Sequence, residues 1–147
     1  MHLERVLGAF GRIGGKEARE AARRFFETPN QETVAEYVRM CLPCYRHAAG
    51  DPNALARTLM NLEVRYDSIA RRQTRFDFLE DLKRIKCPTL VMGGEDDPIT
   101  PIADSEDIAA ALPRKVVQFE RFAGCGHGIV EDAPERFLEV VRDFLKQ

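Results

Sequence analysis

The chain has 147 residues, and its 22 basic and 24 acidic side chains leave a formal net charge of −2. That length allows one ordinary domain with a sizeable core. A charge so close to zero gives no electrostatic reason to expect nucleic-acid binding. No apolar run approaches the roughly 20 residues of a membrane span, and the first residues lack a signal-peptide core, so we expect a cytoplasmic protein without membrane association.

Four cysteines are present, at positions 41, 44, 87 and 125. In a cytoplasmic protein they do not predict a disulfide framework. Cys41 and Cys44 form a Cys-x-x-Cys pair, but the pair closes a predicted helix, whereas a redox motif follows a strand and opens one. A zinc site needs a second ligand pair, and the sequence holds no further Cys-x-x-Cys and no His-x-x-x-His. We therefore expect ordinary thiols, no metal and no cofactor.

The chain begins with helical patterns. Residues 1–15 are weakly periodic and end in two glycines, which predicts a short helix or an ill-ordered arm. Residues 16–27 are rich in helix formers and predict a helix. Its apolar positions recur at spacings of three and four and predict one buried stripe, made of Ala18, Ala21, Ala22, Phe25 and Phe26.

Further helices follow up to the middle of the chain. Asn30 is suited to cap a helix from residue 31 to about residue 41, which Pro43 then ends. Asp51-Pro52 starts another helix, which reaches about Leu62. The polar, arginine-rich residues 67–75 are best explained as a solvated link, in preference to an anion site.

The second half predicts alternating strands and helices. Residues 89–92 form an apolar run typical of a buried strand, and two glycines and three acids then end it. Thr100 is predicted as the N-cap of a helix over residues 102–112, with Pro101 at its first position. The core face of that helix is expected to use Ile108, Ala111 and Leu112. Residues 115–122 predict a second strand, and a last helix starts at residues 132–134, with Phe137, Val140, Val141, Phe144 and Leu145 at helical spacing.

Two polar residues follow these strands. Asp97 follows the first strand, at the carboxyl end where open α/β sheets place their binding and catalytic residues. His127 lies thirty residues later among three glycines, with one helix and one strand in between. That separation fits an acid that orients a general-base imidazole on the neighbouring strand end. Glu95 and Asp96 compete with Asp97, but their proximity to the turn favours a structural role for them.

These loops resemble those of the α/β-hydrolase superfamily. The patterns are Gly-x-x-Asp-x-x-x-Pro at residues 94–101 and Gly-x-Gly-His at residues 124–127. The resemblance implies an α/β class, namely a partial α/β-hydrolase fold with a helical cap over residues 1–75, similar to that of the proline-iminopeptidase-like branch. The last strands and helices of the parallel sheet would then occupy residues 76–147. It also implies that Asp97 is the triad acid and His127 the triad base.

One part of the family's machinery is absent from the sequence. There is no Gly-x-Ser-x-Gly nucleophile elbow and no upstream His-Gly-Gly-type oxyanion loop. The two serines, Ser68 and Ser105, lack elbow context, and Cys125 is too close to His127 along the chain to align for attack. We therefore expect these residues alone to be inactive by the triad route.

Two functions remain open. The first is a serine hydrolase that cleaves small peptides, amides or esters, with an aminopeptidase implied by the proline-iminopeptidase resemblance. Glu63 is then one candidate for binding the substrate amine, although a place on a solvated helix face explains it better. The second is a non-catalytic binding or oligomerisation module derived from a hydrolase. In either case the upstream edge of the strand over residues 89–92 has no sequence-predicted partner. We expect self-association through that edge unless the N-terminal helices cover it.

Overall fold

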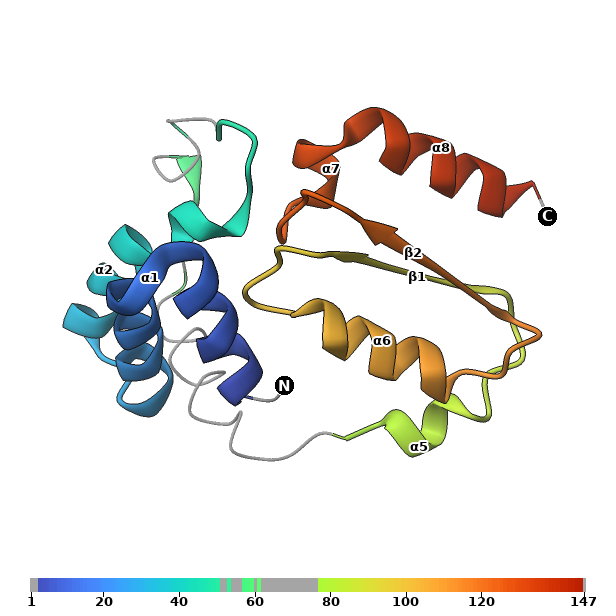
Figure 1. Cartoon of the computed structure of the whole chain (residues 1–147), viewed down its shortest axis with the longest axis horizontal. Helices are drawn as coiled ribbons and strands as arrows, with labels where there is room; N and C mark the ends of the chain where they lie inside the picture. The colour runs from blue at the N-terminus through green and yellow to red at the C-terminus, as the bar shows by residue number, and fades with distance from the viewer. Residues whose placement is uncertain (1–2, 51–52, 54–56, 60, 62–76, 147) are drawn as a thin grey trace.

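The computed structural model describes residues 3–50, 53, 57–59, 61 and 77–146. A helical N-terminal part lies beside an α/β part built from two strands and their flanking helices (Figure 1). This order of elements agrees with the predicted α/β class. The predicted boundary between residues 75 and 76 falls outside the described residues, as do Ser68, Glu63 and most of the helix predicted to reach Leu62. Where that stretch is described, at residues 58, 59 and 61, it is not helical and Leu59 is fully exposed, so this part of the prediction is wrong.

The first helix, α1, spans Leu3–Glu27 and joins the two segments that the sequence separates at its paired glycines. Gly15 has a φ of 76° within it, which is the left-handed region that glycine enters without steric cost. The helix axis therefore kinks there instead of ending. The apolar stripe predicted for the C-terminal half of α1 is confirmed, because the side chains there are buried at Ala18, Ala21, Ala22 and Phe25.

The second helix, α2, spans Gln31–Met40 and is capped as predicted. Asn30 accepts a hydrogen bond from the Thr33 amide (3.0 Å), and the Thr33 hydroxyl accepts one from the Asn30 amide (2.9 Å). This reciprocal pair satisfies two backbone donors that the first turn would leave unbonded. A short 3₁₀ helix, η1, follows over Leu42–Tyr45 and includes Pro43, which agrees with the predicted end of α2.

Aromatic packing between α1 and α2 builds the core of the N-terminal part. The ring of Tyr37 stacks on Phe25 at 4.2 Å between centroids and meets Phe10 edge to face at 5.8 Å. Buried aromatic side chains contribute large apolar areas and geometrically specific contacts. Cys41 is also buried here, its thiol lies 3.3 Å from the Ala18 carbonyl oxygen, and burial raises its pKa to about 12. It behaves as a core thiol, and the four cysteines are all free.

The α/β part contains two parallel strands in one sheet. The strand β1 spans Thr89–Gly94 and β2 spans Val117–Phe122, with Thr89 opposite Val117 and Gly94 opposite Phe122. The helices α6 (Ile102–Ala111) and α8 (Pro134–Leu145) lie on opposite faces of this sheet, as Figure 1 shows. Two short helices complete the part, α5 over Leu79–Leu82 and α7 over Ile129–Asp132. The sequence did not predict α7.

One prediction about α6 is wrong and another is confirmed only in part. The helix has Pro101 as its N-cap and no side-chain cap, and the Thr100 hydroxyl is turned towards Asp97, to which it donates a hydrogen bond. Of the predicted core face, Leu112 is buried and Ala111 is half-buried, but Ile108 is 39% exposed, whereas Ser105 is buried. A methyl group at Gly93 would lie 2.7 Å from the Ser105 oxygen, so α6 and β1 approach closely at this point. That close contact fixes the rotation of α6 about its own axis. Ser105 faces β1, and Ile108 lies at the edge of the interface between helix and sheet.

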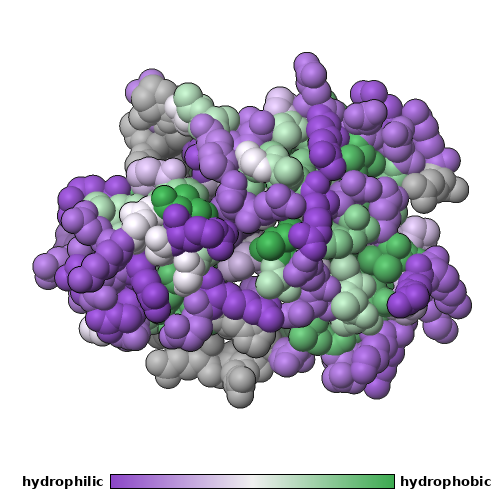
Figure 2. All heavy atoms as spheres, in the orientation of Figure 1, coloured by the Kyte–Doolittle hydropathy of each residue, from purple (hydrophilic) through white to green (hydrophobic). Residues whose placement is uncertain are grey.

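The two parts of the molecule meet along α6 and the loop before it. The Arg5 guanidinium on α1 pairs with Asp104 (2.7 Å) and Asp107 (2.6 Å) on α6. Ile99, in the loop after β1, packs against the apolar core between α1 and α2. Figure 2 shows a mostly hydrophilic surface with apolar side chains that emerge over the α/β part. Within the described residues, none of the helices combines the length and apolar character that crossing a bilayer demands.

Candidate active site

Asp97 and His127 lie in the loops that follow the two strands. Because β1 and β2 are parallel and in register, their carboxyl ends reach the same edge of the sheet. The loops are also bonded to each other, since the Asp96 amide donates to the Cys125 carbonyl at 2.9 Å. As a result, Nδ1 of His127 lies 2.9 Å from Oδ2 of Asp97. The expected meeting of an acid and a histidine at neighbouring strand ends is therefore present.

The Asp97 carboxylate is almost fully enclosed by donors. It is 5% exposed. Oδ1 accepts hydrogen bonds from the amides of Ile99 (2.7 Å) and Thr100 (2.9 Å). Oδ2 accepts from the Thr100 hydroxyl (2.6 Å) and faces His127. Both oxygens are thus fixed, and Oδ2 of the carboxylate meets the imidazole in a single orientation.

The surroundings keep Asp97 ionised. Burial alone would raise the pKa of its carboxyl group, but the hydrogen bonds from His127, Thr100 and Ile99 more than offset this and lower the pKa below its ordinary value. The bond to Asp97 raises the pKa of His127, against the opposing effect of burial, and the negative charge of Glu131 adds to the rise. Since a carboxylate can only accept, Nδ1 of His127 carries the proton in this pair.

The two loops touch so closely that glycine is needed between them. A methyl group at Gly94 would overlap the carbonyl oxygens of Cys125 and Gly126. Gly124 has a φ of 67°, in the left-handed region, and turns the chain between β2 and His127. The glycines of both motifs therefore serve the approach of the acid loop to the histidine loop.

Possible nucleophiles among the described residues are placed elsewhere. Ser105 is buried on α6 against Gly93. The Cys125 thiol is 3% exposed, lies 3.7 Å from the Ala123 carbonyl oxygen, and has a pKa raised by burial, so the reactive thiolate is disfavoured. Among the described residues, neither the Ser105 hydroxyl nor the Cys125 thiol is hydrogen-bonded to His127.

Three residues that the sequence reasoning missed hold this site in place. Thr100 bonds Asp97 as described above, and its Asp-x-x-Thr spacing matches a local side-chain turn, a signal that was available in the sequence. The Tyr45 carbonyl accepts the His127 amide at 2.6 Å. Asp132 accepts the Gly126 amide at 2.8 Å. No local pattern pointed to either Tyr45 or Asp132. Tyr45 is distant from His127 in the chain, and Asp132 also bonds the distant amides of His47 and Ala48.

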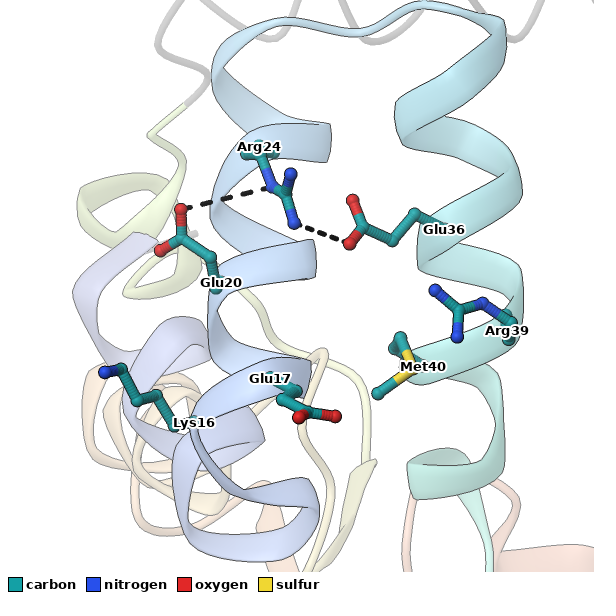
Figure 3. A pocket seen from close by; sticks show the side chains of 7 residues that line it. All are labelled: Lys16, Glu17, Glu20, Arg24, Glu36, Arg39 and Met40. Carbon is teal, nitrogen blue, oxygen red and sulfur yellow. Dashed lines mark hydrogen bonds and ion pairs between the residues drawn. The ribbon is translucent and has the colours of Figure 1, made fainter.

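A charged groove runs between α1 and α2, away from this pair (Figure 3). It has a volume of about 540 Å³ and is lined by Lys16, Glu17, Glu20, Arg24, Glu36, Arg39 and Met40. Arg24 already pairs with Glu36 at 2.5 Å and with Glu20 at 4.0 Å, so charges of both signs neutralise each other across the groove. No group of three or more side chains able to hold a metal gathers anywhere in the described residues.

Comparison with known proteins agrees with this architecture. The family described as alpha/beta hydrolase fold matches residues 9–134. The crystal structure of proline iminopeptidase from Mycobacterium smegmatis superposes with a TM-score of 0.65 and 20% sequence identity, and the match covers 99% of this chain and 53% of that chain. At that identity the likeness concerns the fold alone. The chain belongs to the α/β-hydrolase fold family, and its fold is a partial α/β-hydrolase fold.

Curated relatives cover parts of the chain. The protein named "Putative carbamate hydrolase RutD" of Caulobacter sp. (strain K31) is 39% identical over 70 residues, which are 48% of this chain and 25% of that protein. The monoacylglycerol lipase ABHD6 of Rattus norvegicus is 24% identical over 102 residues, which are 64% of this chain and 30% of the lipase. The chain thus spans less than a third of the length of either relative.

Proposed function

We propose that Asp97 and His127 are the acid and the base of a serine-type hydrolase. The observation that supports this most is the 2.9 Å contact between Nδ1 of His127 and Oδ2 of Asp97 at the carboxyl ends of neighbouring parallel strands. Four hydrogen bonds fix the carboxylate, while the imidazole keeps 45% of its surface exposed. A buried orienting acid and an accessible base are what general-base catalysis requires.

In this mechanism the two residues divide the work. Asp97 holds His127 in the tautomer with its proton on Nδ1, so that Nε2 accepts the proton of an attacking hydroxyl group. The carboxylate then stabilises the imidazolium cation that forms. Nε2 later returns the proton to the leaving amine or alcohol, and water regenerates the enzyme by the same proton transfers.

The nucleophile is the part that these residues do not supply. The 147 residues contain no Gly-x-Ser-x-Gly elbow, so we propose that the attacking serine comes from a segment outside them. The chain matches about half of the proline iminopeptidase structure, which leaves the other half of such a fold to carry that residue. Without it, the acid and base have no group to activate.

For the substrate we propose a small amide or ester, with aminopeptidase activity as the specific case. One relative is named a carbamate hydrolase and another a monoacylglycerol lipase, and both names describe attack on an acyl carbon bonded to nitrogen or oxygen. The aminopeptidase case rests on the resemblance of the acid loop, the histidine loop and the helical cap to the proline-iminopeptidase-like branch.

A complementation assay tests the proposal. The 147-residue chain is combined with a separately expressed hydrolase half that carries the elbow, and release of p-nitrophenol from acyl esters and of p-nitroaniline from proline p-nitroanilide is followed. We expect hydrolysis only from the combination, and a loss of about 10³-fold or more with Asp97→Asn or His127→Ala. If the combination were equally active with both substitutions, the assignment of the two residues would be wrong.

The second candidate function is a non-catalytic binding or oligomerisation module derived from a hydrolase. The missing elbow favours it. In that case neither Asp97→Asn nor His127→Ala should change the affinity for a partner as long as the fold is kept. Loss of binding in both folded variants would speak against a module that does not use the pair.

We also propose self-association through the outer edge of β1. Among the described residues β1 pairs only with β2, on one side. The amide of Thr89 donates to Val116, directly before β2, and that of Glu95 donates to Phe122 in β2. By the alternation of strand hydrogen bonds, the amide and carbonyl groups of Leu90 and Met92 face the opposite side. An open strand edge offers donors and acceptors to a second copy of the chain.

A further inference from the structure

Residues 45–48, here called the strap, connect the N-terminal helices to the loop that carries His127. The Tyr45 carbonyl oxygen accepts hydrogen bonds from the amides of His127 (2.6 Å) and Gly128 (3.4 Å). The Tyr45 ring also meets the imidazole edge to face, with 5.5 Å between centroids. The strap therefore touches both the backbone and the ring of the proposed base.

The strap is rooted in the N-terminal core. Tyr45 is the last residue of η1, and its hydroxyl lies 2.6 Å from the hydroxyl of Tyr37, the buried aromatic centre of that core. On the other side, a methyl group at Gly126 would overlap the Tyr45 carbonyl oxygen. The histidine loop thus depends on glycine at this position to approach the strap, and the contact is a close-packed one.

Asp132 fastens the strap to the histidine loop. Its Oδ1 accepts the amides of His47 (2.8 Å) and Ala48 (2.6 Å) from the strap. Its Oδ2 accepts the amide of Gly126 (2.8 Å), the residue directly before His127. One carboxylate at the end of α7 therefore joins two segments that are about eighty residues apart in the chain.

These bonds are made to an ionised group. Burial would raise the pKa of Asp132, but the amides of Ala48, Gly126 and His47 outweigh that effect and lower it. Hydrogen bonds to a charged acceptor are about twice as strong as those between neutral groups. The strap also reaches the acid loop, where Nε2 of His47 lies 3.1 Å from Oδ2 of Asp96.

We propose that Asp132 is a positioning residue, which clips the strap to the histidine loop and so holds His127 where it meets Asp97. The inference deepens the proposed function and rests on it, because it assigns a means of control to the same acid–base pair. Asp132 does not touch the reacting atoms. Its effect passes through the backbone at Gly126 and the Tyr45 carbonyl, so a displacement of the N-terminal helices would reach His127 by this route.

The test is made on the 147-residue chain by nuclear magnetic resonance of histidine labelled with ¹⁵N. His127→Gln identifies its resonances. In the unaltered chain we expect a protected Nδ1–H proton on His127. In Asp132→Ala we expect that proton to exchange too fast to observe, and the pKa of His127 to fall by about 0.5–1 unit as the bond to Asp97 loosens. Asp132→Asn keeps one acceptor oxygen and should lie between the two.

Glu131→Gln is the matched control. It removes a charge from the residue next to Asp132, and that charge also raises the pKa of His127, but none of the three amide bonds is lost. Its ion pair with Arg46 is long, at 3.8 Å, and exposed, so its loss should matter little. We expect the Nδ1–H signal to survive in Glu131→Gln, which separates loss of position from loss of charge.

The inference is overturned if Asp132→Ala gives a single cooperative unfolding transition and keeps the Nδ1–H signal. If that variant does not fold, Asp132→Asn decides in the same way. This readout does not depend on hydrolysis. If the signal is lost in Asp132→Ala but the unaltered chain shows no activity in the complementation assay, the positioning role is sustained and the proposed function is defeated. If the signal is retained in Asp132→Ala and the unaltered chain is active, the proposed function is sustained and the positioning role is defeated.

Discussion

Asp97 and His127 share one hydrogen bond of 2.9 Å but occupy opposite environments. The side chain of Asp97 is 6% exposed and that of His127 is 45% exposed. The buried member is surrounded by donors and remains ionised, whereas the other keeps a ring edge open to solvent. This asymmetry underlies the expected behaviour of the pair on titration and on mutation.

Asp97→Asn should lower the pKa of His127 towards its ordinary value. The hydrogen bond to Asp97 is the largest cause of the raised pKa, and the neutral amide removes the negative charge that favours the imidazolium form. The histidine ring protons, followed by nuclear magnetic resonance as a function of pH, measure this. Glu80→Gln, which removes an exposed carboxylate on α5, is the control and should leave the titration unchanged.

The same pair should make stability depend on pH in two directions. The pKa of His127 is raised in the folded chain, so its contribution to the free energy of unfolding is complete below about pH 6.5. That contribution is lost as pH rises through the higher folded pKa. The pKa of Asp97 is lowered, so its contribution is present above about pH 3.8 and is lost as pH falls through the lower folded pKa. Stability from the pair is therefore greatest between these limits.

Urea denaturation at several pH values tests this dependence. Since His127 is nearly half exposed, solvent screening should reduce the loss between pH 6 and pH 8 to about 0.5 kcal/mol. His127→Gln should remove that loss. If the variant kept the full slope over this range, another group would be responsible for it.

Gly94→Ala should destabilise the chain by about 2 kcal/mol or more. The added methyl group would overlap two backbone carbonyl oxygens of the histidine loop, which cannot rotate away as a side chain can. Gly8→Ala is the matched control, because Gly8 is an exposed position on α1 with nothing within 4 Å of the added atom. It should stabilise α1 by about 0.5–1 kcal/mol. Equal effects of both changes on thermal unfolding would contradict the close approach.

Local sequence signals predicted most of the helices and strands, and the places of Asp97 and His127 after the two strands, because each of these depends on neighbouring residues. The Asn30 cap, the stripe of α1 and the strand ends before Asp97 and His127 follow from spacing within a few positions. The contacts that hold the histidine loop in place do not follow from such local spacing. Tyr45 acts on the histidine loop from a distant part of the chain, and Asp132, which lies close to that loop, ties it to the distant amides of His47 and Ala48.

The error at Thr100 has a related cause. A threonine before a proline and a helix is a good N-cap by local preference. Here the Asp97 carboxylate is a charged acceptor within reach, and the hydroxyl donates to it at 2.6 Å. The bond to the charged carboxylate holds the hydroxyl at Asp97, and its oxygen accepts no hydrogen bond from the first turn of α6.

Met92→Pro should weaken the proposed self-association without unfolding the chain. The amide of Met92 faces the outer edge of β1 by the strand alternation, so proline there removes an edge donor and keeps the bonds to β2. Sedimentation equilibrium over a range of concentrations should show dimers of the unaltered chain and monomers of this variant.

Val91→Pro is the control one residue away. Its amide faces β2, so its loss should destabilise the fold itself by about 3 kcal/mol. A monomeric unaltered chain at high concentration would show that the edge is not a contact surface, and dimers that persist in folded Met92→Pro would place the contact elsewhere.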